Sequence, residues 1–426
     1  MQIESSIPPV ISTWQGDALA PVSAAERIET LDVLRGFALF GILTVNMALF
    51  SWPVYEMVTA AKEWTTRADA ITDCVVRFLA EGKFYPLFSF LFGLGMAIQM
   101  ERATARGAPF AGRFCRRLLV LLAIGLTHAF VIWEGDILVW YAVFGFLLLA
   151  FRNCKPRTLL VWAAVFLMIP VALYVLFWAM MAVGSLVPEV AKTIDQEIGR
   201  ANESYSRAAE ENLRVFAHGS VGEVFGQRAQ NVLFLWQFTW FFAPTFFAMF
   251  LLGLYAGKRR LLQEVEENAG FIRRLLVGGL CLGLPANLIY TIGYEFTDPM
   301  YINFPQVITA TAHVLGGPSL CIAYMAAFAL LLRQPDWQRR LRPLGTAGRM
   351  ALSNYLFQSL VCTTIFYSYG LGWYGSVGRT AGLGLVAIIY AAQIPLSVGW
   401  LKHFRFGPVE WIWRTLTYGK RQPMRV

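Results

Sequence analysis

The residues with the clearest potential for chemistry lie on one apolar segment near residue 120. Arg117 and His128 are eleven positions apart, which at about 100° per residue is close to three full turns of a helix. Both side chains therefore project from one face, about 16 Å apart along the axis, and Arg113 lies one turn before Arg117. Arginines in such a position suit an anionic ligand, and the histidine beyond them suits general base catalysis near neutral pH.

Both features also have simpler explanations. Arg113, Arg116 and Arg117 could lie at the end of this segment only because cationic residues gather at the cytoplasmic border of membrane helices. His128 could be a packed group that hydrogen-bonds a neighbouring carbonyl. The shared face of Arg117 and His128 favours a functional interpretation, since neither simpler explanation requires it.

Further polar residues fall within or beside apolar segments. Asp136 follows His128 by eight positions and could orient its ring or cap the next helix. Asp32 and Arg35, at the start of the first apolar segment, could form an ion pair, and Asn46 lies later in that segment. His313 is another imidazole in an apolar segment, with nothing to single it out.

A second set of polar residues lies just before the segment 350–369 and along one side of it. Arg349 comes just before it, and Ser353, Asn354 and Gln358 run along it. They could line a cavity or hydrogen-bond to neighbouring helices. No group of His, Cys and Asp has the spacing of metal ligands, so we expect no metal.

The elements that position these residues are apolar helices. The chain has 426 residues, of which 57% are apolar and 15% charged, whereas soluble proteins carry about 25% charged residues. Ten segments are apolar and long enough for membrane helices within tolerance: 33–52, 84–100, 118–133, 137–151, 158–187, 232–257, 275–294, 307–332, 350–369 and 380–401. The sequence predicts an all-α membrane protein with about ten transmembrane helices. The net charge of +9 does not indicate nucleic-acid binding, because Lys and Arg occur in short clusters between these segments.

The distribution of charge predicts the orientation. With both termini in the cytoplasm, 26 of the 36 Lys and Arg residues lie inside, and the net charge is +15 inside and −6 outside. This is the bias that inner-membrane proteins show. Residues 1–25 lack a basic region followed by an apolar core, so we expect no cleaved signal peptide.

The predicted organisation has three parts. Residues 1–26 form a flexible segment, 27–401 the transmembrane domain with outside loops 53–83 and 188–231, and 402–426 a cytoplasmic amphipathic tail. The loop 188–231 has helix-forming composition and could be a solvated cap or a lid over a substrate opening. The tail could anchor in the inner interface or close a pocket from below. The pairs Gly253/Gly257, Gly279/Gly283 and Gly378/Gly382 predict close helix packing, within one chain or in a homodimer.

Five sequence blocks stand in order along the chain: 27–46 (RIETLDVLRGFALFGILTVN), 88–95 (FSFLFGLG), 135–142 (GDILVWYA), 348–359 (GRMALSNYLFQS) and 407–418 (GPVEWIWRTLTY). Together they resemble the bacterial YeiB family of membrane proteins. That family is distantly similar to transmembrane acyltransferases, namely the acyltransferase-3 enzymes and the lysosomal heparan glucosaminide N-acetyltransferase. Leu34-Arg35-Gly36 and the pair Arg117 and His128 carry the distant similarity. The resemblance implies an acyltransferase-like bundle in the bacterial cytoplasmic membrane.

In those enzymes acetyl-CoA enters from the cytoplasm, and a histidine inside the membrane assists transfer to an acceptor from the other side. On this basis our hypothesis is that Arg113, Arg116, Arg117, Arg349 and Arg35 would bind the donor acyl-CoA, and that His128 would be the base, steadied by Asp136. Asn354 or Gln358 would stabilise the oxyanion, and Asp32 and Asn46 would belong to the substrate region. The acceptor would be a small molecule, a glycan or a lipid. A transporter with a polar-lined path is the alternative.

Overall fold

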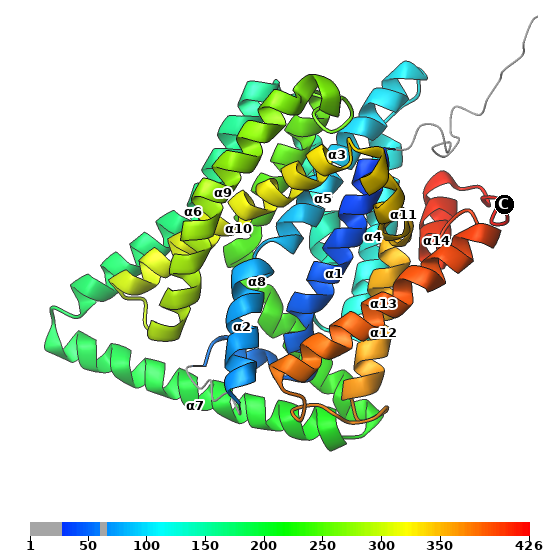
Figure 1. The fold of residues 1–426 in the computed structure, drawn as a ribbon. Coiled ribbons are helices and arrows are strands. Elements are labelled where there is room, and N and C mark those ends of the chain that lie inside the picture. Colours follow the sequence, from blue (N-terminus) through cyan, green and yellow to red (C-terminus); the bar gives the residue numbers. More distant parts are fainter. Residues whose placement is uncertain (1–27, 60–65) are drawn as a thin grey trace, which may run out of the picture.

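The computed structural model describes residues 28–59 and 66–426, which fold into a bundle of long helices (Figure 1). Within those ranges the chain forms helices and no strand, and one isolated bridge pairs Phe404 with Arg425. Seven described helices are long and apolar enough to cross a membrane. The prediction of an all-α membrane protein is confirmed. The expected N-terminal segment 1–26 lies outside the described residues.

The elements are, in chain order, α1 (Glu29–Ser51), η2 (Val54–Met57), α2 (Arg67–Leu79), α3 (Phe84–Ala105), α4 (Ala111–Thr127), η3 (His128–Ile132), α5 (Leu138–Ala150), α6 (Pro156–Gly184), α7 (Pro188–His218), α8 (Val221–Lys258), α9 (Val265–Phe296), α10 (Phe304–Leu331), α11 (Pro335–Arg349), α12 (Ala351–Phe366), α13 (Arg379–His403) and α14 (Pro408–Tyr418). Each of the ten expected apolar segments overlaps a helix, with α4 and η3 sharing the third. The helices over the expected segments 84–100, 137–151 and 350–369 are not among the seven, so ten membrane crossings remain a prediction.

Helix α8 begins at Val221, eleven residues before the apolar segment that starts at 232. The reason is local, because Ser220 and Glu223 form a capping box that starts the helix there. The outside region expected at 188–231 is therefore the single helix α7 followed by the first turns of α8.

Helices α7 and α14 mark two ends of the bundle. In Figure 1, α7 runs along the bottom, while α11 and α14 lie higher, on the right. Helix α12 runs between them: the Glu410 carboxylate of α14 accepts hydrogen bonds from the first N–H groups of α12, and Tyr367, just after α12, stacks on Phe216 of α7. We refer below to the α14 end and the α7 end of the bundle.

Glycines bring several helices into close contact. A Cβ on Gly253 of α8 would lie 2.0 Å from the Phe90 carbonyl oxygen of α3, and a Cβ on Gly279 of α9 would lie 2.7 Å from the Ser319 carbonyl oxygen of α10. Only glycine permits backbones to approach so closely. The Gly253/Gly257 and Gly279/Gly283 pairs thus pack helices within one chain, whereas Gly378 lies against the Asp69 carboxylate.

Helices α2 and α3 are two parts of one broken helix. Gly82, between them, has a positive φ of 79°, which glycine adopts without strain. Lys83 is fully buried and donates to the Arg77 carbonyl oxygen at 2.8 Å, so it satisfies one of the carbonyls left free where α2 ends.

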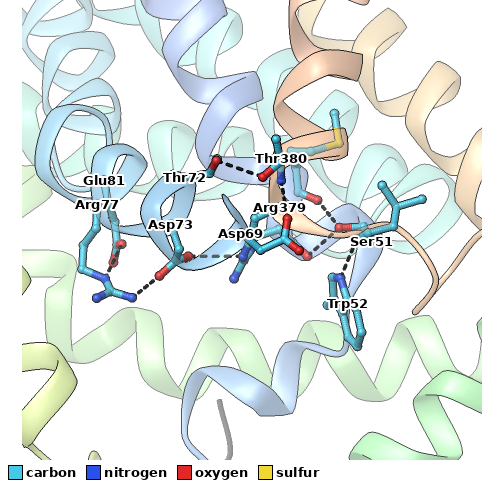
Figure 2. A network of polar contacts seen from close by, with 12 residues as sticks. Ser51, Trp52, Asp69, Thr72, Asp73, Arg77, Glu81, Arg379 and Thr380 are labelled. Carbon is cyan, nitrogen blue, oxygen red and sulfur yellow. Dashed lines mark hydrogen bonds and ion pairs between the residues drawn. The ribbon is translucent and has the colours of Figure 1, made fainter. Parts of the chain in front are cut away.

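Ionic contacts tie α2 to its neighbours, as Figure 2 shows. The Asp69 carboxylate accepts from the Thr380 N–H at 2.8 Å, which places a negative charge at the start of α13. Arg379 pairs with Asp73 at 3.2 Å, and Asp73 also pairs with Arg77. Arg77 reaches Glu295 of α9 as well. This network links α2 to the α7 ends of α9 and α13.

Candidate active site

The hairpin formed by α4, η3 and α5 positions the first catalytic candidates. Helix α4 ends at Thr127 and continues as one π-helical turn, in which the His128 carbonyl accepts from the Trp133 N–H at 2.8 Å. Such turns insert a residue into a helix and often occur at functional sites. Gly125 permits the return helix α5 to approach, since a Cβ there would lie 2.7 Å from the Val139 nitrogen.

His128 and Asp136 meet across this hairpin. His128 Nδ1 lies 2.7 Å from Asp136 Oδ1, while Asp136 Oδ2 accepts from the Val139 N–H at 2.8 Å. His128 is 1% exposed and Asp136 6%. The Asp136 carboxylate therefore contacts both the imidazole ring and the first turn of α5, the two positions that the sequence suggested for it.

The other imidazole nitrogen faces Ser359, in the middle of α12. His128 Nε2 and Ser359 Oγ are 2.9 Å apart, and Ser359 is fully buried. An ionised carboxylate only accepts hydrogen bonds, so with a neutral imidazole Nδ1 donates to Asp136 and Nε2 accepts from the serine hydroxyl. Sequence reasoning missed Ser359, although it ends the block 348–359 and follows Gln358 directly.

Aspartate, histidine and serine in one hydrogen-bonded series form an arrangement that can activate a hydroxyl as a nucleophile, and it is recognised by geometry rather than sequence order. Aromatic rings surround it. The Tyr355 ring lies 5.0 Å from the His128 ring, and the buried Trp133 ring lies 6.1 Å away and stacks on Phe50 of α1. The series is thus held in a dry interior, where electrostatic interactions are strong.

A cationic cluster lies at the α14 end of the same helix α4. The Arg117 guanidinium lies 3.7 Å from the centre of the Trp413 ring, and the Trp413 N–H donates to the Arg117 carbonyl at 2.9 Å. The positive charges of Arg414 and Arg35 act on Arg117. Arg116 lies beside the turn at Gly419 that follows α14. Three of the expected arginines therefore gather here, and Arg414 joins them.

Of the remaining expected residues, Asp32 pairs with Arg35 at 2.8 Å, as predicted. Arg113 lies on the first turns of α4, Arg349 ends α11, and both are half-buried. Asn46 is half-buried in the second half of α1. Gly348, next to Arg349, packs against the Asp32 backbone of α1, whereas Asn46 lies farther along that helix.

Asn354 and Gln358 join helices. Asn354 donates to the Ala347 carbonyl and to Ser397 Oγ, both at 3.0 Å. The Gln358 amide donates to Gln393 of α13 at 2.8 Å. The two alternatives for this polar face were a lined cavity and hydrogen bonds to neighbouring helices; the structure shows the hydrogen bonds. Ser353 binds Glu410, so this face also receives α14.

The tail is docked on the bundle. Glu410 Oε1 accepts from the N–H groups of Leu352 at 2.7 Å and Ser353 at 3.0 Å. Burial raises the pKa of the Glu410 carboxyl. Together with the contact between Trp413 and Arg117, these bonds dock α14 against α4 and α12.

A second buried network, which sequence reasoning also missed, supports the apex of the hairpin. Glu134, two positions before Asp136, accepts from Asn231 at 3.1 Å and Tyr367 at 3.0 Å, and its carboxylate lies 3.9 Å from Arg228. Arg228 donates to the Val131 carbonyl at 2.7 Å. Asn212 of α7 donates to Asn231 at 2.8 Å. The end of α7 is thereby linked to the segment that carries Asp136.

Within residues 28–59 and 66–426, no three His, Cys, Asp or Glu side chains are grouped closely enough to hold a metal ion. His313, on α10, lies beside Gly82, and its ring is 4.3 Å from that of Tyr290. It stands apart from the series that contains His128.

Comparison with known proteins gives the family. A family model described as "Protein of unknown function (DUF418)" matches residues 256–420, which include Ser359 and α14. The chain is similar to "Uncharacterized protein YxaH" of Bacillus subtilis (strain 168), with 38% identity over 96% of this chain and 98% of the relative. It is also similar to "Uncharacterized protein YeiB" of Escherichia coli (strain K12), with 30% identity over 92% of this chain and 96% of the relative. The blocks seen in the sequence and the length of these matches agree: the chain belongs to the YeiB family of multi-pass membrane proteins.

Proposed function

We propose that the chain is a membrane acyltransferase. It moves an acyl group, such as acetyl, from cytoplasmic acyl-CoA to a hydroxyl or amine that arrives from the other side of the bacterial inner membrane. The observation that carries the proposal is the buried series of Asp136, His128 and Ser359, in which Asp136 and His128 belong to the same helix hairpin as Arg117 and Ser359 comes from α12.

The charge bias of the loops supports a cytoplasmic position for the α14 end. Arginines suit phosphates because the guanidinium binds two oxygens at once. Arg117, Arg35 and Arg414 place positive charge near one another, and Asp32 already pairs with Arg35. The 3′- and diphosphate groups of coenzyme A would bind at this cluster as additional anionic partners.

The spacing along α4 fits the donor. Eleven residues of helix between Arg117 and His128 correspond to about 16 Å, comparable to an extended pantetheine arm. A coenzyme A molecule held at the α14 end therefore presents its thioester near His128. His128 removes a proton during transfer, and Asp136 holds the ring and stabilises the imidazolium that forms.

The first test is isothermal titration of the detergent-purified protein with acetyl-CoA and with desulfo-CoA. The proposal predicts micromolar binding of both, because the phosphates dominate recognition. Arg117→Ala weakens this binding at least tenfold, whereas Arg200→Ala, on the exposed face of α7, does not. Absence of binding at millimolar ligand in a folded sample contradicts the proposal.

One observation favours a transporter as the second candidate. The break between α2 and α3 places the charged side chains of Arg77, Glu81 and Lys83 beside packed helices, and helix breaks of this kind form binding sites in transporters. Counterflow of a small solute in proteoliposomes, without any covalent product, distinguishes this function from acyl transfer.

A further inference from the structure

We infer that Ser359 carries the acyl group as an ester, so that transfer takes place in two half-reactions. The inference rests on the proposed function and deepens it, because it assigns a covalent step to a residue that sequence reasoning did not select. His128 then serves both half-reactions: in each it first accepts a proton as a base and then returns it as an acid.

The geometry at Nε2 favours this step over direct transfer. A neutral imidazole has one accepting nitrogen, and here that nitrogen is 2.9 Å from Ser359 Oγ. The hydroxyl also lies 3.3 Å from the Tyr355 carbonyl of its own helix, which is the longer contact. An acceptor molecule that used His128 directly would first have to displace Ser359, whereas Ser359 is already in position.

Burial favours an ester intermediate as well. Ser359 is fully buried, and His128 and Trp133 are 1% and 0% exposed. A site without water protects a reactive ester from hydrolysis. Since the side chains enclose the series completely, the helices around Tyr355 must part for a substrate to enter, as in other enzymes with closing sites.

The position of Ser359 in the bundle gives a further reason. It is eight residues after the start of α12 and seven before its end, which places it about 10–12 Å from each end of the helix. With the acyl group stored there, the site needs to open only to the α14 end for the donor and later only to the α7 end for the acceptor. Direct transfer requires both openings at once.

The bonds balance in each half-reaction. In the first, Ser359 Oγ adds to the thioester carbonyl while its proton passes to His128 Nε2; the C–S bond breaks, and the thiol of coenzyme A leaves with that proton. In the second, the acceptor O–H or N–H gives its proton to Nε2 and attacks the ester. The bond between carbonyl carbon and Oγ breaks, and Oγ takes the proton back.

The test needs no acceptor. Purified full-length protein is incubated with unlabelled acetyl-CoA and isotopically labelled coenzyme A, and label that appears in acetyl-CoA is measured. Only a covalent acyl-enzyme permits this exchange in the absence of acceptor. Ser359→Ala should reduce the exchange rate by about 1,000-fold or more, while acetyl-CoA binding persists. Thr364→Ala, an exposed change on the same helix, serves as the matched control. Peptide mapping should locate one acetyl group on Ser359.

The outcomes separate the two proposals. Exchange in the native protein, its loss in Ser359→Ala with binding retained, and an acetylated Ser359 peptide support the serine ester. Binding of acetyl-CoA without exchange or acetylated peptide overturns the serine ester and leaves direct transfer with His128 as the base standing. Acetyl found on His128 instead also overturns the serine ester, in favour of an acetyl-histidine intermediate. Absence of acetyl-CoA binding overturns both.

Discussion

The imidazole of His128 and the hydroxyl of Ser359 are 2.9 Å apart, although 231 positions separate these residues in the chain. Helix α12 and the π turn η3 bring them together in the middle of the bundle. Because Asp136 holds the other imidazole nitrogen at 2.7 Å, all three side chains have a fixed relative orientation. Such preorganisation is what acid–base chemistry on a substrate requires.

Asp136→Asn tests the orienting role. Asparagine accepts from the Val139 N–H through its single oxygen and so turns its NH2 group to Nδ1. Nδ1 must then accept, and the imidazole loses the tautomer whose Nε2 accepts from Ser359. Acetyl transfer should fall about 10³–10⁴-fold, with acetyl-CoA binding unchanged. Asp336→Asn, on the exposed surface of α11, controls for the loss of one negative charge. Activity within a few-fold of the native protein would show that Asp136 acts only as a helix cap.

Glu410→Ala tests how the tail is held. The change removes the acceptor of the Leu352 and Ser353 N–H groups at the start of α12, which should cost about 1–2 kcal/mol. Release of α14 also removes Trp413 from Arg117, so acetyl-CoA binding should weaken roughly tenfold, equivalent to about 1.4 kcal/mol. Thermal unfolding and titration measure the two effects. Unchanged values, equal to those of the exposed Glu210→Ala variant, would contradict the docking role.

The network at the hairpin apex predicts a large, coupled effect on stability. Glu134→Gln leaves Arg228 buried without its ionic partner, which should cost about 3–5 kcal/mol. The double change Glu134→Gln with Arg228→Met removes both charges and should recover a large part of this loss. A double-mutant cycle of thermal unfolding measures the coupling. Additive changes in the free energy of unfolding would show that the Glu134 and Arg228 side chains do not interact.

Glu56, on η2 at the α7 end, predicts a dependence of stability on pH. Burial raises the pKa of its carboxyl from 4.5 to about 7, and the charge of Arg379 opposes this shift. The folded state therefore holds the proton more tightly than the unfolded state. The stabilisation is complete below about pH 4.5 and is lost as the pH rises through about 7.

Glu56→Gln cannot ionise, so it should be more stable than the native protein at pH 8, by on the order of 2 kcal/mol. The difference should vanish near pH 4.5. Melting temperatures of both proteins across this range measure it, with Glu203→Gln on the exposed face of α7 as the control. A constant difference at all pH values would show that Glu56 is not the titrating group.

The helices could be predicted from the sequence because apolarity and length are local properties. The contact of His128 with Asp136 was also accessible, since both residues flank one short turn. The contact of Ser359 with His128 could not be predicted, because it depends on which face of α12 packs against η3. A contact between helices so far apart in the sequence leaves no local pattern. The position of Arg414 in the arginine cluster could not be predicted for the same reason. Helix α8 begins earlier than the apolar pattern predicts, because the N-cap at Ser220 determines where it starts.

The interpretation of Asn354 and Gln358 illustrates a further limit. A polar stripe on an apolar helix predicts a polar partner, but not whether the partner is a ligand or another helix. Here the partners are Ser397 and Gln393 of α13.

The most direct test of acyl transfer follows label from acetyl-CoA in inverted inner-membrane vesicles that contain the protein. Labelled acetyl-CoA is supplied at the outer face of the vesicles, which corresponds to the cytoplasm, and acetylated product protected inside is counted. We expect product with the native protein and none with His128→Ala, although this variant still binds acetyl-CoA. Equal amounts of covalent product from both proteins would contradict the catalytic role of His128.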